Sequence, residues 1–242
     1  MIEINDATIQ RDGIKILEDI TLKVADGQIV TVIGESGCGK STLLRAVMRL
    51  IPIAAGEICI DGVCINGLSE HQMNEVRKKM GMVFQEGALF DSMNVRENVA
   101  FALRQHTRMK ESEIRQTVSE RLEAVGLADA EKKMPSQLSG GMRRRVAIAR
   151  ALALHPKILL YDEPTTGLDP VLTDTILDLI VRMRNRYNTT TIVVTHDMDA
   201  AIKISDRIAL IHDKHIAADD VVESIKNNPN PLLKRFLHGQ GT

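Results

Sequence analysis

The residues 34–41, Gly-Glu-Ser-Gly-Cys-Gly-Lys-Ser, have the types and spacing of a phosphate-binding loop, G-x-x-x-x-G-K-[ST]. An apolar strand at 29–33 precedes them and helical spacing follows at 40–50, so backbone N–H groups and a positive helix end can converge on phosphate oxygens. Lys40 would neutralise the β and γ oxygens, and Ser41 would offer its hydroxyl to Mg²⁺. The nucleotide-binding residues predicted here are Gly34, Glu35, Ser36, Gly37, Cys38, Gly39, Lys40, Ser41 and Thr42. The loop alone also fits kinases and GTPases, and chance produces such a string in about one chain in a hundred.

A second candidate anion site is Leu138-Ser-Gly-Gly-Met142, which opens another helical segment at 143–152. The Ser139 hydroxyl and the side-chain-free Gly140 and Gly141, at a helix N-terminus with bare N–H groups, suit a γ-phosphate. An isolated Ser-Gly-Gly would more often be an N-cap followed by a tight turn. The phosphate interpretation therefore depends on further matching motifs.

Two adjacent carboxylates end the apolar strand 158–161, and Asp162 lies 128 residues after Gly34 (162 − 34). Asp162 could hold Mg²⁺ from the outer shell, and Glu163 could orient the attacking water or accept its proton. The alternative is that the pair only caps the turn at Pro164. The sequence thus offers both a metal-holding group and a general base at one strand end.

Two more polar residues follow predicted strands, and each would mean little alone. His196 ends the strand 191–195, where it could reach the γ-phosphate, although an isolated histidine there is usually structural. Gln85 follows the strand 81–84 and could reach Mg²⁺ or water. The predicted catalytic residues are therefore Glu163, His196 and Gln85, and the predicted metal ligands are Ser41, Gln85 and Asp162.

The elements that must position these residues predict an α/β fold with a mostly parallel core sheet. The opening residues alternate as in an antiparallel sheet with one wet face, whereas 94–154 is helical without an intervening strand. We predict one domain, 1–242, with an ATP-binding core at about 1–85 and 157–220. An inserted helical subdomain would occupy about 86–156, and C-terminal helices about 221–242.

Composition narrows the classes of function. The chain has 242 residues, 44% of them hydrophobic, which can bury a substantial core, and a net charge of −1, which offers no bulk attraction for nucleic acid. No apolar run approaches the roughly 20 residues of a membrane-spanning helix. Neither a signal peptide nor a paired CxxC zinc motif is present, so we expect a cytoplasmic protein whose three cysteines are free thiols.

The order of the motifs resembles that of the ABC ATPase family over essentially the whole chain: phosphate loop, Gln85, Leu138-Ser-Gly-Gly, Asp162-Glu163, Gly167-Leu-Asp169, His196. The resemblance implies a P-loop NTPase fold and a head-to-tail homodimer. Each ATP would lie between one chain's phosphate loop and the other chain's Ser139, Gly140 and Gly141, with Asp169 across the interface. Closure would drive a transporter and hydrolysis would reopen it.

Two positions depart from the family pattern. The signature usually ends in Gln where this chain has Met142, which removes one polar side chain. Family members often place an aromatic under the adenine, at a position near 9–12, and none of those residues is aromatic here. Discrimination among nucleoside triphosphates is therefore expected to be loose.

Further stretches resemble the MlaF-type ATPases of MCE-linked phospholipid transport: 87–95, 104–107, 123–127, 134–136 and the Met142 ending. This resemblance implies two copies of an MlaE-like integral membrane permease, a periplasmic MCE-domain protein and a small STAS-domain subunit. The protein would lie peripherally on the cytoplasmic face of a bacterial inner membrane. The alternatives are an importer ATPase for polar solutes such as amino acids, or a soluble ABC ATPase of DNA repair or translation.

Three local expectations complete the sequence-based interpretation. The apolar run 88–90 is a candidate floor for a groove that receives a permease helix, although burial of Phe90 in the chain's own core is equally compatible. The basic run 143–145 is expected to be a solvated helix face. Cys38, beside Lys40 and a helix N-terminus, is expected to have a lowered thiol pKa and to react with thiol reagents unless ATP protects it.

Overall fold

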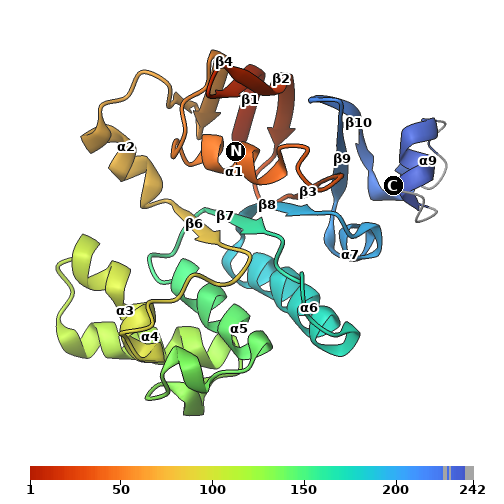
Figure 1. Cartoon of the computed structure of the whole chain (residues 1–242). Helices are drawn as coiled ribbons and strands as arrows, with labels where there is room; N and C mark the ends of the chain where they lie inside the picture. The colour runs from red at the N-terminus through yellow and green to blue at the C-terminus, as the bar shows by residue number, and fades with distance from the viewer. Residues whose placement is uncertain (226–227, 229, 238–242) are drawn as a thin grey trace.

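The computed structural model describes residues 1–225, 228 and 230–237. A six-stranded sheet occupies the middle of the molecule, a smaller antiparallel sheet lies at one end, and a group of helices lies at the other (Figure 1).

The central sheet is parallel except at one edge. Its order is β10 (His215–Val221), β9 (Arg207–His212), β3 (Ile29–Gly34), β8 (Thr190–Thr195), β7 (Ile158–Asp162) and β6 (Met80–Val83), with only β10 antiparallel to its neighbour. Every residue of β3, β7 and β8 is buried. Near-continuous apolar runs of this kind are typical of parallel strands covered on both faces. The predicted mostly parallel core sheet is confirmed.

Side chains alternate between the two faces of this sheet. Val30 and Val32 join the core beneath the antiparallel sheet, whereas Ile29 joins the core formed with the helices. Because β3, β8, β7 and β6 are parallel, their carboxyl ends lie at the same edge of the sheet. Polar side chains that follow these ends lie at that edge.

The antiparallel sheet has the order β2 (Ile14–Val24), β1 (Ile2–Arg11), β4 (Ala55–Ile60) and β5 (Val63–Cys64). The two-residue turn Asp61-Gly62 joins β4 to β5, with φ of 49° and 76°. Both values match the left-handed turn that suits tight hairpins, for which Asp-Gly is a preferred sequence. This turn aligns Cys59 with Cys64 across the hairpin.

Helices cover the central sheet and form the separate helical layer. They are α1 (Lys40–Val47), α2 (Glu70–Arg77), α3 (Val95–His106), α4 (Glu111–Ala124), the 3₁₀ turns Ala128–Ala130 and Pro135–Gln137, α5 (Gly140–Ala151), α6 (Pro170–Tyr187), α7 (Met198–Ile204), α8 (Val222–Ile225) and α9 (Pro231–Leu237). Between β6 and β7 the chain is helical with no strand, as expected. The rest of the predicted C-terminal helical segment, 226–227, 229 and 238–242, lies outside the described residues.

The start of the helical layer is fixed by side-chain hydrogen bonds. Asn94 caps α3 by accepting from the backbone N–H of Glu97 at 2.9 Å, and Glu97 accepts from the N–H of Asn94 at 2.8 Å. Asn98 is fully buried and donates to the carbonyls of Phe90 and Met93. These bonds hold the loop after Gln85 against α3.

The expectation of three free thiols is wrong for two cysteines. Cys59 and Cys64 form a disulfide, and Cys38 is free. The Asp61-Gly62 turn makes the pair direct cross-strand neighbours, where Cβ atoms approach most closely. The odd number of cysteines suggested free thiols, but the pairing depends on the turn that brings the two strands together.

Candidate functional site

The phosphate loop connects β3 to α1 through glycines that other residues could not replace. Gly39 has φ of 108°, and a Cβ added there would lie 2.8 Å from Cδ2 of Leu17. A Cβ at Gly34 would lie 2.7 Å from the carbonyl oxygen of Ile211. The backbone can therefore curl tightly and aim its N–H groups at an anion.

Lys40 lies over this loop and is almost fully enclosed. Its Nζ donates to the carbonyl oxygens of Gly34 at 2.8 Å and Glu35 at 2.9 Å, and only 6% of the residue is exposed. The same atom lies 3.8 Å from Oε1 of Glu163. A fixed positive charge thus faces both the loop and the strand-end carboxylate.

The Ser41 hydroxyl lies against the carboxylate of Asp162. Its Oγ donates to Oδ1 of Asp162 at 2.6 Å, joining the start of α1 to the end of β7. Asp162 is 5% exposed. A hydroxyl and a carboxylate so arranged are the hard oxygen donors that Mg²⁺ prefers, so the residues fit this ion.

Glu163 is held in a special backbone and side-chain geometry. Its φ is 47°, a left-handed conformation that is uncommon outside glycine. Its Oε2 accepts from Oγ1 of Thr166 at 2.9 Å and lies 3.0 Å from Nδ1 of His196. The carboxylate is therefore oriented by two neighbours while Oε1 faces Lys40.

Thr166 is a site residue that sequence reasoning missed. It lies three residues after Glu163 and follows Thr165, and neither hydroxyl is distinguished by its sequence context. Only the turn that returns the chain toward Glu163 identifies which threonine bonds to it.

A cleft of about 320 Å³ gathers predicted residues from four segments of the chain. Its lining residues are Ser36, Gly37, Gly39, Lys40, Ser41, Thr42, Gln85, Glu163, Thr166 and His196. Gly34, Glu35, Cys38 and Asp162 support this lining from the loop and the strand end without forming part of it. The predicted phosphate-binding residue Lys40 and the predicted general base Glu163 therefore line the same cleft.

The environment of Cys38 differs from the expectation. Burial raises the pKa of its thiol, and this outweighs the lowering by the charge of Lys40. The predicted lowering of the pKa is wrong because the thiol lies partly beneath the loop, among apolar side chains, instead of facing solvent.

The second anion site lies apart from this cleft. Ser139 is exposed and caps α5, its Oγ accepting from the N–H of Met142 at 3.3 Å. Of the described residues that line the cleft, none belongs to 139–141. Gly140 instead lines a different, larger cleft of about 600 Å³, together with Arg143 and Gly167.

Asp169 is exposed at the start of α6. Its Oδ1 accepts from the N–H of Leu172 at 2.9 Å, so the carboxylate caps the helix within its own chain. The second carboxylate oxygen remains available on the surface.

The basic run 143–145 is not a solvated face, because only Arg143 is exposed. Arg144 is 8% exposed and donates to the carbonyls of Pro164 at 3.2 Å and Thr166 at 3.1 Å. Burial lowers the pKa of this guanidinium. Arg144 thereby ties α5 to the turn that carries Glu163.

An apolar groove of about 400 Å³ lies beside the loop that follows Gln85. Its lining residues are Met48, Leu50, Met80, Gly81, Met82, Phe84, Ala88, Phe90, Phe101, Ala102, Arg150, Ala151 and Leu154. Phe90 is 42% exposed and packs on Phe101 at a centroid distance of 4.9 Å. Arg150 donates to the carbonyls of Gly87 and Ala88, so α5 also holds this loop.

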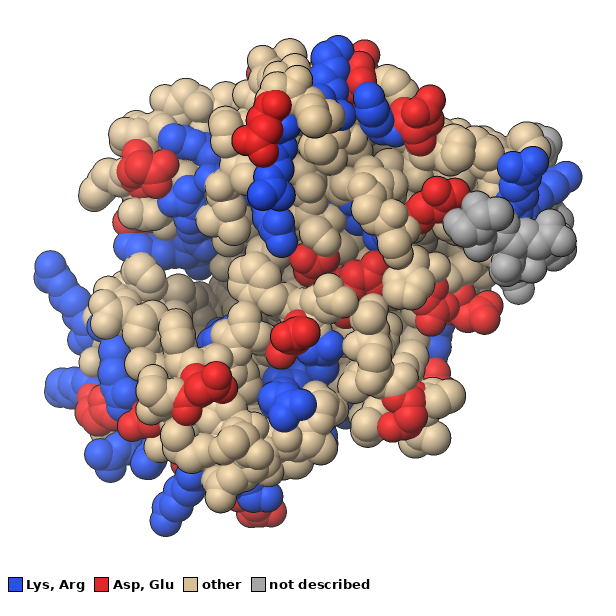
Figure 2. All heavy atoms as spheres, in the orientation of Figure 1, with Lys and Arg blue, Asp and Glu red and all other residues tan. Residues whose placement is uncertain are grey.

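The view in Figure 2 shows a hollow between the part of the molecule that carries α2 and the part that carries α3. Lys and Arg side chains alternate with Asp and Glu over this face. Across the residues that the structure describes, every helix is too short or too polar to cross a bilayer.

Comparison with protein families gives a match to the model described as "ABC transporter" over residues 17–166. A second model, for an AAA domain, matches residues 134–201. The first match spans the phosphate loop, Ser139, Glu163 and the cleft residues between them.

Comparison with curated proteins gives relatives that match over almost the whole of this chain. The chain is 42% identical to the "Intermembrane phospholipid transport system ATP-binding protein MlaF" of Haemophilus influenzae, over 99% of this chain and 91% of that protein. The Escherichia coli K12 protein of the same name is 41% identical, over 99% and 89%. The "Probable ribonucleotide transport ATP-binding protein mkl" of Mycobacterium bovis is 41% identical, over 99% of this chain and 67% of that protein.

Solved structures share the fold. A dimeric post-hydrolysis state of the ATP-binding cassette MJ0796, bound to ADP and Pi, superposes with a TM-score of 0.84 at 33% identity, covering 92% of this chain and 99% of that one. CbiO1 from Clostridium perfringens, part of the transporter complex cbiONQ, gives a TM-score of 0.87 at 28% identity, covering 98% and 94%.

Proposed function

The chain belongs to the ABC transporter family of ATP-binding proteins, and from that premise we propose that it powers phospholipid transport through a separate membrane permease. Its activity is the hydrolysis of ATP to ADP and phosphate. The observation that carries this assignment is that Lys40, Ser41 and Glu163 line one cleft, with the Asp162 carboxylate hydrogen-bonded to Ser41 beside it.

Each chain supplies half of a complete site. The cleft contains the phosphate loop but none of residues 139–141; Ser139 is exposed and Gly140 lines a different cleft. A head-to-tail homodimer would bring Ser139, Gly140 and Gly141 of one chain to the phosphates held by the other. The second oxygen of Asp169 would then be available to link the two sites. Dimeric relatives of the same fold support this arrangement.

The chemistry at the cleft follows from the positions of the charged groups. Lys40 neutralises the terminal phosphate oxygens of ATP. Glu163 orients the attacking water and accepts its proton, and His196 and Thr166 fix which carboxylate oxygen does so. Ser41, Asp162 and Gln85 are the residues that would hold Mg²⁺, which when bound supplies charge neutralisation at the phosphate oxygens.

Residues 9–12, near which the family often places an aromatic for the adenine, include no aromatic in this chain. Ile14 is 66% exposed, and Ile16 packs at Gly39 of the loop. We assign these two residues as the adenine platform, which offers apolar contact without ring stacking and therefore little discrimination between purine bases.

The cargo assignment rests on the relatives that match over most of their length. Those named for phospholipid transport are covered to 91% and 89%, whereas the one named for ribonucleotide transport is covered to 67%. Two MlaE-like permeases would each seat a helix in the apolar groove that contains Phe90. A periplasmic MCE-domain protein and a STAS-domain subunit complete the proposed complex, with this chain on the cytoplasmic face of the inner membrane.

The test expresses the complex from its native promoter, purifies it and reconstitutes it into proteoliposomes. These proteoliposomes carry a fluorescent phospholipid on one leaflet. Lipid movement should require ATP and should stop in the Glu163→Gln complex. ATP hydrolysis stimulated by an amino acid and its binding protein, without lipid movement, would identify a polar-solute importer. A complex with no membrane subunit would identify a soluble ABC ATPase.

A further inference from the structure

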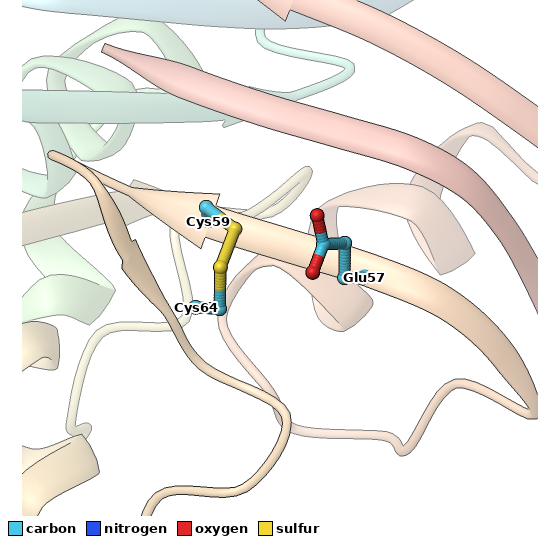
Figure 3. A group of neighbouring side chains, drawn as sticks. All are labelled: Glu57, Cys59 and Cys64. Carbon is cyan, nitrogen blue, oxygen red and sulfur yellow. A yellow bond between two sulfur atoms is a disulfide. The ribbon is translucent and has the colours of Figure 1, made fainter.

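Three side chains on the antiparallel sheet form a compact group remote from the cleft. Figure 3 shows Glu57 and Cys59 on the strand β4 and Cys64 on the neighbouring strand β5, with the two sulfur atoms joined. The ligand atoms of the three side chains all lie within 4.8 Å of one another. None of the three lines the nucleotide cleft or the apolar groove.

The geometry of the strands places all three on one face. Ile58 and Ile60 point into the core, each 1% exposed, so Glu57 and Cys59 point to the opposite face. Cys64 is the direct partner of Cys59 across the hairpin and shares that face. Glu57 and Cys64 are exposed, so the group can be reached from solvent.

The carboxylate is oriented by a neighbouring strand. Nδ2 of Asn5 donates to Oε1 of Glu57 at 3.2 Å, and Asn5 is the register partner of Glu57 on β1. One carboxylate oxygen is thereby engaged and the other is left for a ligand, which is how outer hydrogen bonds orient metal-binding groups. A disulfide that only stabilises the hairpin would require the two sulfur atoms alone and would give no role to the Glu57 carboxylate.

We propose that the dithiol form of Cys59 and Cys64, together with Glu57, binds a thiophilic divalent cation of the Zn²⁺ type, and that the disulfide is the oxidised form of the same site. Two thiolates and one carboxylate are three of the four ligands of a tetrahedral zinc site, and water supplies the fourth. Mg²⁺ and Ca²⁺ prefer all-oxygen sites, so the donor set selects against them.

The two forms interconvert by thiol–disulfide exchange with a low-molecular-weight disulfide. The S–S bond of that molecule breaks and the Cys59–Cys64 bond forms. The two thiols of the protein lose two electrons and two protons, and the small disulfide becomes two thiols. Bound metal occupies both sulfur atoms, so metal binding and disulfide formation exclude each other.

The experiment uses the full-length protein, reduced with a phosphine, desalted without oxygen and titrated with Co²⁺ in the absence of nucleotide. Co²⁺ replaces Zn²⁺ as a probe because its thiolate complexes absorb in the near ultraviolet. About one equivalent per chain should produce this absorption, and Zn²⁺ should displace it. The oxidised protein should produce none.

Matched variants assign the ligands. Cys59→Ser and Cys64→Ser should each lose the two-thiolate absorption, and Glu57→Gln should weaken Co²⁺ binding by about tenfold or more. Cys38→Ser is the control, because Cys38 is the free cysteine in the nucleotide loop, and it should bind Co²⁺ unchanged. Far-ultraviolet circular dichroism and a cooperative thermal transition report that each variant is folded.

The outcome that overturns the proposal is also specific. Three results would each reject the site. They are the absence of thiolate absorption in the reduced protein, its persistence in folded Cys64→Ser, and its loss in Cys38→Ser. A second readout is the rate at which glutathione disulfide oxidises the pair, which Zn²⁺ should slow in the parent protein. An unchanged rate with saturating Zn²⁺ would equally reject it.

Discussion

The hydroxyl of Ser41 donates a 2.6 Å hydrogen bond to Oδ1 of Asp162, although 121 residues separate them in the chain. This bond joins the first turn of α1 to the carboxyl end of β7 and so fixes the distance between the phosphate loop and the strand-end acids. Glu163 directly follows Asp162, so the same strand end also fixes its position. The phosphate loop and the strand-end acids, which form two sides of the cleft, are therefore held in a fixed relative position.

Asp162→Asn should lower Mg²⁺-dependent ATP hydrolysis by about a hundredfold, because the hydrogen bond to Ser41 can survive while the negative charge that favours Mg²⁺ is lost. The measurement is steady-state phosphate release as a function of Mg²⁺ concentration. Raising Mg²⁺ should restore part of the activity. Wild-type turnover at low Mg²⁺ would remove Asp162 from the metal site.

Glu163→Gln should keep MgATP binding and lower turnover by about a hundred- to ten-thousandfold, because the amide cannot accept the proton of the attacking water. The variant should also accumulate as a closed dimer with ATP, detected by size-exclusion chromatography. Lys40→Ala is the contrasting variant and should weaken nucleotide binding itself. Ordinary hydrolysis by Glu163→Gln would contradict its assigned role.

Reactivity of Cys38 should follow the raised pKa of its thiol. The thiolate is the reactive form, so a raised pKa lowers the thiolate fraction near about pH 7.5 and slows alkylation relative to glutathione. The rate should rise steeply as pH increases toward that raised pKa, and MgATP should slow it at every pH. Labelling of the unreduced protein by iodoacetamide, followed by mass spectrometry, measures both effects. Equal rates with and without MgATP would show that bound nucleotide does not shield the Cys38 thiol.

Local sequence was sufficient for those parts of the site that a single element determines. Glu163 follows an apolar strand directly, so its place at the edge of a parallel sheet could be predicted. Thr166 could not, because its bond to Glu163 depends on a left-handed residue that turns the chain back. The fold class was predictable for the same reason, since buried strands and helical spacing are local patterns.

Contacts between segments distant in sequence explain why the prediction for the basic run 143–145 was wrong. Three consecutive arginines show no difference in sequence, yet only Arg144 meets the carbonyls of the turn after Glu163. The strand β10 was missed because its residues are mostly exposed or half-buried at a sheet edge, where apolar alternation is weak. The Asp61-Gly62 turn carried a recognisable hairpin signal that would have paired Cys59 with Cys64.

Arg144→Ala should lower the free energy of unfolding by about 2–4 kcal/mol, because the carbonyls of Pro164 and Thr166 lose their donor in a buried position. Arg143→Ala is the matched control on the same helix turn. Its residue is exposed and, among the described residues, its guanidinium donates only to the carbonyl of Leu138, so the loss should be no more than about 1 kcal/mol. Urea denaturation of both variants provides the comparison. Equal destabilisation would show that Arg144 is not a special link between α5 and the Glu163 turn.

Phe90→Asp should separate ATP chemistry from coupling to the permease. Phe90 is 42% exposed in the apolar groove, and a carboxylate there would have to be buried beneath an apolar permease helix. Permease binding should fall by about a hundredfold or more, because burying an unpaired charge costs several kcal/mol. Val63→Asp is the control, since Val63 is also 42% exposed but lies on the antiparallel sheet. Co-purification with the permease and permease-stimulated ATP hydrolysis are the two readouts. If both variants bind the permease as well as the parent protein does, the groove is not the docking site, whereas loss in Phe90→Asp alone assigns it.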